Sequence, residues 1–160
     1  MELKFKVDAR VAKPVAEVFE AVVDPAQLSR YFTTGGAEGR IEAGATVYWD
    51  FHDFPGGFPV EVMAVEHNRR IVLSWEVNEE PSGREGSMAK APSPYSTTVT
   101  MEFEEFEPGR TLVSIAEEGW HDTPAGLKAS YGNCQGWSQM LCALKVWLEH
   151  GINLRDGMYK

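Results

Sequence analysis

The stretch TPAGLKASYGNCQGWSQMLCALKVWLEHG, which runs from Thr123 to Gly151, predicts one long helix near the end of the chain. Thr123 is suited to cap this helix, with Pro124 in its first turn and Gly151 as a left-handed stop. At about 1.5 Å per residue the helix spans roughly 40 Å, the width of a small domain. Its large apolar residues recur at spacings of three and four and so form one stripe: Trp137, Met140, Leu141, Leu144, Trp147 and Leu148. We therefore expect this helix to be the central packing element of the fold.

Three glycines, Gly126, Gly132 and Gly136, lie in the first half of the predicted helix. Glycine in a helix interior costs about 1 kcal/mol relative to alanine. We expect this half of the helix either to bend or to leave room for something beside it.

The residues before the long helix predict mainly strands. Residues 3–11 alternate between apolar and charged side chains, the pattern of a strand with one dry face. Apolar positions in residues 14–23 share one helical face, and a second short helix is predicted at 26–32 after Asp24-Pro25. Further strands are predicted at residues 39–42, 46–51, 60–66, 70–77, 97–105 and 111–117. This order indicates an α+β fold, in which a curved antiparallel sheet of about six to seven strands packs around the C-terminal helix.

Turn residues separate the predicted strands, with Phe54-Pro55-Gly56-Gly57 among them. Residues 78–96 (NEEPSGREGSMAKAPSPYS) hold three prolines and two glycines and predict a long flexible loop. The chain contains no internal repeat and no sign of a second domain. We expect residues 1–160 to form a single domain.

Composition limits the classes of function. Hydrophobic residues make up 43% of the 160 residues and the net charge is −9, which is typical of a globular protein and disfavours nucleic acid as a partner. Neither a signal peptide nor a membrane span is evident, so a cytoplasmic location is expected. Cys134 and Cys142 are eight positions apart, about 12 Å along a helix, and are expected to be reduced thiols. No metal or cofactor motif is present.

The alternating strands would give the sheet one face rich in aromatic residues. Trp49 and Phe51 share a face of one predicted strand, Trp75 lies on a face of another, and Met101 and Phe103 share a face of a third. If these faces point the same way, the space between sheet and helix is either a filled core or a ligand pocket lined by aromatic residues. Both alternatives stay open at this stage.

Four stretches resemble a known family: KPVAEVFEAVVDPAQLSRYF, GGAEGRIEAGATVYWDF, FEEFEPGRTLVSIAEEGW and YGNCQGWSQMLCALKVWLEHG. Together they are similar to the activator of heat-shock protein 90 ATPase homologue family, within the START-like (SRPBCC) helix-grip superfamily. The resemblance implies a seven-stranded sheet that grips the long C-terminal helix. It also implies a cavity, which in relatives holds lipids, sterols, polyketides or other apolar molecules. It does not imply one chemistry, because superfamily members include carriers, cyclases and chaperone regulators.

The leading hypothesis is a module that binds a small apolar, lipid-, polyketide- or aromatic-like ligand between sheet and helix. We expect the ligand to be lined by Trp49, Phe51, Trp75, Met101, Phe103, Tyr131, Trp137, Met140 and Leu141. Candidates for a polar group that orients the ligand are His52, Tyr48 and His121.

Two other hypotheses remain. One is an enzyme of the cyclase, aromatase or hydrolase type that uses the same pocket, for which a buried histidine or carboxylate should point inward. The other is a chaperone-associated stress-response protein that contacts an Hsp90-type partner through its surface, and a homodimer is also open. We assign no catalytic residue: His52-Asp53 and His121-Asp122 are adjacent pairs beside loops, where neighbouring side chains diverge, and Glu117-Glu118 is a further pair of carboxylates.

Overall fold

The computed structural model describes residues 1–79 and 95–160, and these residues form seven strands and three helices. The strands are β1 (Leu3–Val11), β2 (Gly36–Glu38), β3 (Thr46–Phe51), β4 (Phe54–Glu66), β5 (Arg70–Glu76), β6 (Ser96–Glu107) and β7 (Arg110–Trp120). The helices are α1 (Val15–Val23), α2 (Pro25–Tyr31) and α3 (Pro124–His150). The flexible loop predicted at 78–96 falls largely on residues 80–94, which lie outside the described residues.

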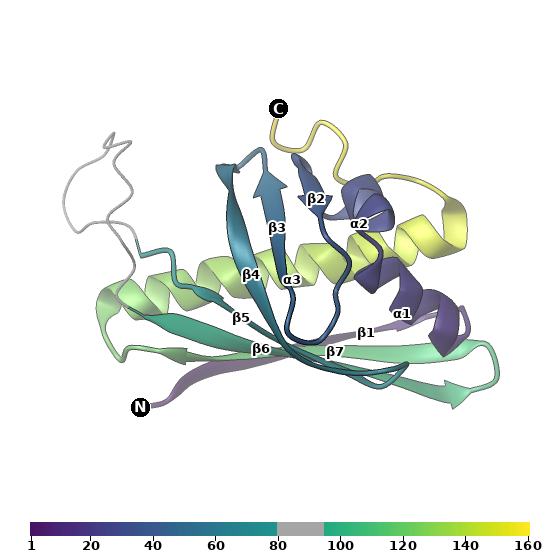
Figure 1. Cartoon of the computed structure of the whole chain (residues 1–160), viewed down its shortest axis with the longest axis horizontal. Coiled ribbons are helices and arrows are strands. Elements are labelled where there is room, and N and C mark those ends of the chain that lie inside the picture. Colours follow the sequence, from purple (N-terminus) through teal and green to yellow (C-terminus); the bar gives the residue numbers. More distant parts are fainter. Residues whose placement is uncertain (80–94) are drawn as a thin grey trace.

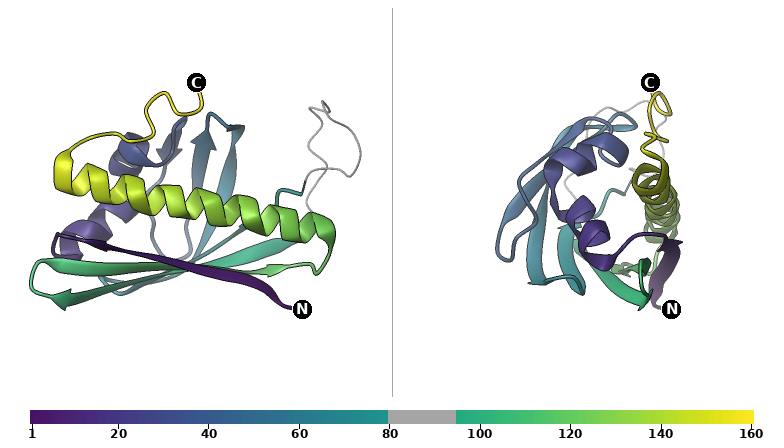
Figure 2. Two further views of the ribbon diagram at one scale, coloured as in Figure 1. Left: turned by 180° about the vertical axis from the view of Figure 1, so that it is seen from behind. Right: turned by 90° about the vertical axis from the view of Figure 1, so that its right-hand side faces the viewer.

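All strands join one antiparallel sheet in the order β1-β7-β6-β5-β4-β3-β2. In Figure 1, β1, β5, β6 and β7 run lengthwise while β2, β3 and β4 rise across them, so the sheet is strongly curved. The two views in Figure 2 show α3 lying along the concave side of this sheet, with α1 and α2 beside its C-terminal half. This arrangement confirms the predicted α+β helix-grip fold.

The ends of α3 form as the sequence predicts. The Thr123 hydroxyl accepts a hydrogen bond from the backbone N–H of Gly126 at 3.0 Å, which caps the first turn. Gly151 closes the helix with a φ of 67°, a left-handed conformation that favours glycine. A side chain at Gly126 would meet the carbonyl oxygen of His121 at 2.0 Å, so close packing of the backbone requires glycine there.

The core lies between α3, the short helices and the concave face of the sheet. Along α3 the predicted apolar stripe is confirmed: Trp137, Met140, Leu141 and Leu144 are buried, and Trp147 and Leu148 pack against the core in partly buried positions. Strands β3, β5 and β6 contribute their predicted apolar faces to the same cluster. Burial of this stripe fixes α3 against the sheet because apolar burial contributes about 25 cal/mol per Å².

Two predicted elements are displaced. The strand predicted at residues 39–42 is wrong, because pairing with β3 ends at Glu38 and the next residue, Gly39, has a φ of +91°. The turn predicted at residues 54–57 is also wrong, because β4 already begins at Phe54 and pairs with Phe51. The Asp50 carboxylate accepts the backbone N–H groups of Gly56 and Gly57 at 3.0 and 3.3 Å, which holds this glycine pair as an irregular part of the strand.

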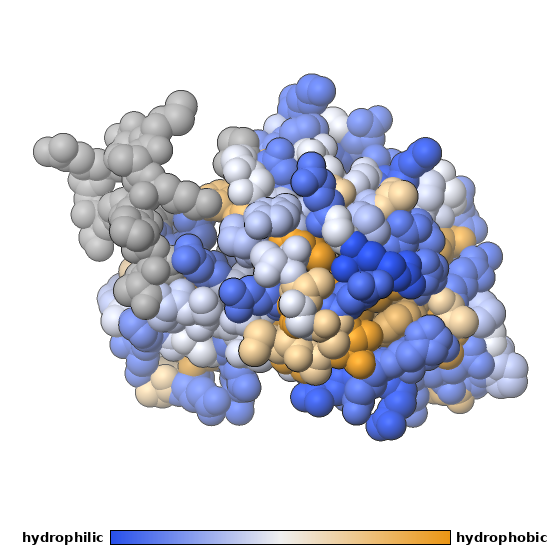
Figure 3. Space-filling view, viewed as in Figure 1, coloured by the Kyte–Doolittle hydropathy of each residue, from blue (hydrophilic) through white to orange (hydrophobic). Residues whose placement is uncertain are grey.

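The outer surface agrees with the alternation in the sequence. Figure 3 shows a mostly hydrophilic face, crossed in its lower half by a narrower hydrophobic band. Glu102 and Glu104 of β6 are exposed, while Met101 and Phe103, which alternate with them, are buried. Among the described residues, no helix is both long enough and apolar enough to cross a membrane.

Candidate functional site: an aromatic pocket beside a buried carboxylate

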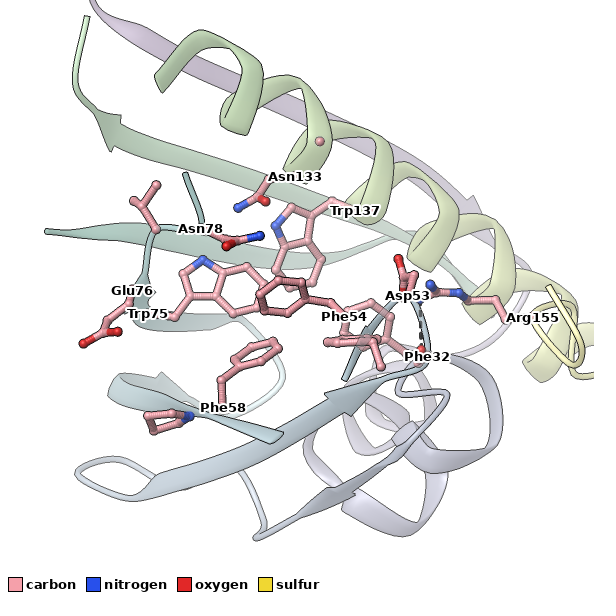
Figure 4. A pocket seen from close by; sticks show the side chains of 15 residues that line it. Phe32, Asp53, Phe54, Phe58, Trp75, Glu76, Asn78, Asn133, Trp137 and Arg155 are labelled. Atoms are coloured by element: carbon pink, nitrogen blue, oxygen red, sulfur yellow. Dashed lines mark hydrogen bonds between the residues drawn. The ribbon is translucent and has the colours of Figure 1, made fainter. Parts of the chain in front are cut away.

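A cavity of about 250 Å³ lies between α3 and the part of the sheet formed by β3, β4 and β5 (Figure 4). We call it the aromatic pocket. Its lining residues are Phe32, Phe51, Asp53, Phe54, Phe58, Pro59, Trp75, Glu76, Val77, Asn78, Gly132, Asn133, Gly136, Trp137 and Arg155. Typical small-molecule sites have volumes of roughly 300–1,000 Å³, so this cavity suits a compact ligand.

Aromatic rings hold one another in place around the pocket. The indoles of Trp75 and Trp137 lie 5.4 Å apart between centroids, and Phe32 stacks on Trp137 at the same distance. Phe58 contacts Trp75 edge-on at 5.6 Å. Trp49 is not a lining residue, but its buried ring packs edge-on against Trp75 at 5.8 Å from behind. Each such pair contributes about 0.5–1.5 kcal/mol beyond area burial, so the aromatic walls are preorganised.

The wall that α3 contributes consists partly of bare backbone. Gly132 and Gly136 line the pocket one helical turn apart, and a Cβ at either position would meet nothing within 4 Å. Neither glycine has a positive φ, so no backbone conformation requires it. Of the two outcomes that the sequence left open, the structure therefore supports the second, in which these glycines leave room beside the helix.

A buried carboxylate anchors the two indoles of the pocket. Glu117 of β7 has no exposed surface, and its Oε1 accepts the Trp137 indole N–H at 2.8 Å. Its Oε2 accepts the Trp75 indole N–H at 3.0 Å and the Thr97 hydroxyl at 2.6 Å. The Asn133 amide donates to Oε2 at 2.9 Å and to Oε1 at 3.2 Å. Donors thus occupy both oxygens. Three of the four donor residues, Trp75, Asn133 and Trp137, line the pocket.

The charge on Glu117 is under opposing influences. Burial raises the pKa of this carboxyl, while the hydrogen bonds from Thr97, Trp75, Trp137 and Asn133 act in the opposite direction. Glu117 itself is not among the lining residues, and it has no exposed surface through which a ligand in the cavity could reach it. Its direct effect is to fix the orientation of Trp75 and Trp137.

The polar lining residues lie towards two ends of the pocket. In Figure 4, Glu76 is at one end, while Arg155 and Asp53 are together at the other. The Arg155 guanidinium donates a hydrogen bond to the backbone carbonyl of Phe32 at 2.9 Å. No group of three or more His, Cys, Asp or Glu side chains within residues 1–79 and 95–160 is placed to hold a metal ion.

The structure separates the nine predicted lining residues into three groups. Phe51, Trp75 and Trp137 line the pocket. The other buried members, which pack in the core without lining the pocket, are Trp49, Met101, Phe103, Met140 and Leu141. Tyr131 is 68% exposed, and the expectation that it lines the cavity is wrong. It precedes Trp137 by six positions, which on a helix of 3.6 residues per turn places it well away from the face that carries Asn133 and Trp137.

The three polar candidates lie outside the aromatic pocket. Tyr48 is 49% exposed on β3, because it alternates with the buried Val47 and Trp49. His121 is exposed after β7, where its ring stacks on Tyr95 at 3.6 Å. His52 is exposed in the turn between β3 and β4 and lines a second, smaller cavity. None of them is among the residues that line the aromatic pocket.

Sequence reasoning named Glu117 only as one of a pair of carboxylates and did not place it beside the pocket, and it missed Arg155. For Glu117 a signal was present, because period-two alternation from Val113 and Ile115 places it on the dry face of β7. Arg155 lies in the short tail after α3, outside every strand and helix, so no periodic pattern predicts its burial. Phe54 falls in the predicted turn and Phe58 before the strand predicted at 60–66, which hid the place of both on β4.

Residues 12–149 match the family described as activator of Hsp90 ATPase homolog 1-like protein. The chain belongs to this family. The match covers most of the chain, from the end of β1 almost to the end of α3. No curated protein sequence matches the chain.

Solved structures support the same assignment for this member of the activator of Hsp90 ATPase homolog 1-like family. The protein SSP2350 from Staphylococcus saprophyticus is 27% identical, with a TM-score of 0.72 and coverage of 96% of each chain. An Aha1 dimer from Colwellia psychrerythraea is 19% identical (TM-score 0.68, 93% of this chain and 98% of that one). DynU16, from the dynemicin biosynthetic locus, is 23% identical (TM-score 0.70, 92% of this chain and 48% of that one). The last two likenesses concern the fold alone.

Proposed function

We propose that this protein binds a small apolar molecule of up to three rings in the aromatic pocket. The observation that carries the proposal is a cavity with aromatic walls whose helix side includes the bare backbone of Gly132 and Gly136. Two glycines in one helix cost about 2 kcal/mol relative to alanine. Because neither is required by φ or by a close contact, the space that they keep open is the feature that a ligand would use.

The anchored indoles support the same proposal. Glu117 fixes Trp75 and Trp137 from behind with hydrogen bonds of 3.0 and 2.8 Å. Rings that are held before a ligand arrives need not be ordered when it binds, which lowers the entropic cost of association. An apolar ligand would gain face and edge contacts with these indoles and with Phe58.

An enzyme of the cyclase, aromatase or hydrolase type would require a carboxylate or histidine within reach of the ligand. A buried carboxylate is present in Glu117, but four donors occupy its oxygens and it does not line the cavity. General acid-base chemistry needs a group at about 2.6–3.2 Å from the proton that moves. Glu117 is therefore not placed to act as an acid or base on a ligand in the pocket, and the carboxylates that do line it, Asp53 and Glu76, lie at its two ends (Figure 4).

A role through the surface would involve a different part of the molecule. The hypothesis of an Hsp90-type partner in a stress response, the homodimer and the cytoplasmic location all stay predictions. The chaperone hypothesis predicts a filled interior, and the aromatic pocket of about 250 Å³ favours ligand binding instead.

The proposal can be tested with N-phenyl-1-naphthylamine, a neutral fluorescent probe, titrated into the full chain. Gly136→Leu places a side chain into the cavity and should lower the affinity for the probe about tenfold or more, because each 1.4 kcal/mol changes affinity by that factor. Tyr131→Leu is the matched control, since it introduces the same residue on the exposed side of the same helix.

The wild type and Tyr131→Leu should bind the probe with equal affinity, and circular dichroism should show that both variants fold. A wild type that does not bind the probe, or a Gly136→Leu variant that binds it as well as the control does, would contradict the proposal.

A further inference from the structure

Arg155 is a buried cation without a carboxylate partner. It is 3% exposed, and within the described residues it forms no ion pair. Its guanidinium lies over the rings of Phe32 at 5.6 Å, Phe51 at 5.7 Å and Tyr159 at 5.1 Å. One Nη1 hydrogen bond reaches the carbonyl of Phe32, and the buried Nε has no acceptor.

The buried guanidinium of Arg155 therefore has fewer hydrogen-bond acceptors than its donors require. A buried charge is usually paired, and a buried donor that lacks an acceptor costs about 1–3 kcal/mol. The guanidinium presents five N–H donors in a rigid fork whose edges match a carboxylate. The aromatic contacts offset part of the cost, but they leave the fork of Arg155 short of acceptors.

Arg155 lies where two cavities meet. Together with Phe32 it lines both the aromatic pocket and a second cavity of about 80 Å³, which we call the polar pocket. The polar pocket is lined by Ser29, Tyr31, Phe32, Thr33, Thr34, His52, Asn153, Arg155, Asp156, Gly157 and Lys160. Thr33 is fully buried, and its hydroxyl oxygen is a second buried polar atom without a partner.

Positively charged side chains outnumber carboxylates around the polar pocket, where Arg155 and Lys160 lie against Asp156. Of the hydroxyl groups that line it, those of Ser29 and Tyr31 already donate to backbone carbonyls, whereas that of Thr33 has no partner. Two orphaned polar atoms, Arg155 Nε and Thr33 Oγ1, belong to residues that line this one small space. Neither atom is open to solvent, so a carboxylate oxygen would satisfy them through a shift of neighbouring side chains on binding.

We propose that the ligand is an apolar carboxylic acid, with its ring system in the aromatic pocket and its carboxylate on Arg155 at the border of the polar pocket. This inference rests on the proposed function, because it names the chemical class of the molecule bound there. Asp53 faces the same end of the aromatic pocket as Arg155 (Figure 4), so its negative charge opposes the bound acid.

Isothermal titration calorimetry of the full chain at neutral pH can compare three probes of one shape: 2-naphthoate, 2-naphthamide and 2-naphthylmethylamine. The acid should bind about tenfold or more tightly than the amide, the ratio that one charge-assisted hydrogen bond supplies. The amine should bind more weakly than the amide, because the same site would repel its charge.

Three variants test which residues make the protein prefer the acid over the amide. Arg155→Met keeps an unbranched apolar side chain and should reduce the affinity for naphthoate to that for naphthamide, with the amide unchanged. Thr33→Val keeps the shape of a buried side chain, so this variant should fold even if Arg155→Met does not. It should weaken the binding of naphthoate and leave the binding of naphthamide unchanged. Asp53→Asn should strengthen naphthoate binding.

The outcomes are distinguishable from those of the proposed function. Failure of all three naphthalene probes to bind would overturn both proposals. Equal affinity for acid and amide, or a preference for the amine, would overturn this inference and leave apolar binding intact. The inference would also be overturned if Arg155→Met weakened acid and amide equally while the folded state persisted, or if Thr33→Val left the ratio of the two affinities unchanged.

Discussion

Alanine at two glycines of α3 should have opposite effects on stability. At Gly136 an added Cβ would meet nothing within 4 Å, so Gly136→Ala should gain the full helix propensity, about 1 kcal/mol. For a protein of this size such a gain raises Tm by about 2–4 °C. At Gly126 the same methyl group would lie 2.0 Å from the carbonyl oxygen of His121 and 3.3 Å from the Thr123 hydroxyl.

The difference between the two variants isolates the clash. Both substitutions share the propensity gain, and both lie on the same helix. Forcing an extra methyl group into a packed site costs about 1–3 kcal/mol, so Gly126→Ala should be less stable than Gly136→Ala by that amount. The clash involves backbone atoms at the start of α3, which cannot move as a flexible side chain would.

Urea unfolding followed by circular dichroism measures both free energies of unfolding. The free energy of unfolding of Gly126→Ala should be lower than that of Gly136→Ala by about 1–3 kcal/mol. The two variants should have similar m values. Equal effects at the two positions would refute the geometry of the N-terminal turn. A loss of stability in Gly136→Ala would show that the space beside this glycine is filled, which would refute the aromatic pocket.

Three further predictions concern the anchoring carboxylate, the central indole and the helix cap. Burial raises the folded-state pKa of Glu117 above its unfolded value, so the stability advantage of the wild type over Glu117→Gln should shrink as pH rises above about 4. Urea unfolding of both proteins at several pH values measures this difference in stability. A difference that grows in favour of the wild type as pH rises would be inconsistent with the raised pKa. Trp137→Ala should cost about 3–5 kcal/mol and weaken N-phenyl-1-naphthylamine binding; thermal melting with a probe titration would reveal the error if stability fell and affinity did not. Thr123→Ala should cost about 1 kcal/mol through loss of the cap, with the probe affinity unchanged, and a loss of probe binding in this variant would count against a pocket at mid-helix.

The elements with strong local signals could be predicted from the sequence. Helix α3 runs between the predicted cap at Thr123 and the predicted stop at Gly151 because cap, proline and glycine act locally. Strand β3 has its predicted bounds, and β1 does too, because each alternates along its whole length. The start of β4 could not be predicted, since it depends on the Asp50 carboxylate accepting the backbone of Gly56 and Gly57, a contact across the hairpin.

The candidate site was only partly accessible to sequence reasoning. Periodicity identifies which faces are apolar, and it correctly brought Trp75 and Trp137 together. It cannot tell a side chain that lines a cavity from one that fills the core, because both are buried. Trp49 and Met140 belong to the second group. The place of Arg155 depends on where the tail returns to the end of α2, which no local pattern encodes.

The most direct test of apolar binding is a ¹H–¹⁵N correlation spectrum of the full chain during titration with N-phenyl-1-naphthylamine. The chain has five tryptophans, whose indole N–H signals can be assigned with single Trp→Phe variants. The signals of Trp75 and Trp137 should shift most, because these rings line the aromatic pocket. Trp147, which packs against the core nearer the C-terminal end of α3 and does not line the pocket, should stay in place. An unchanged spectrum, or shifts confined to Trp147, would contradict ligand binding in the aromatic pocket.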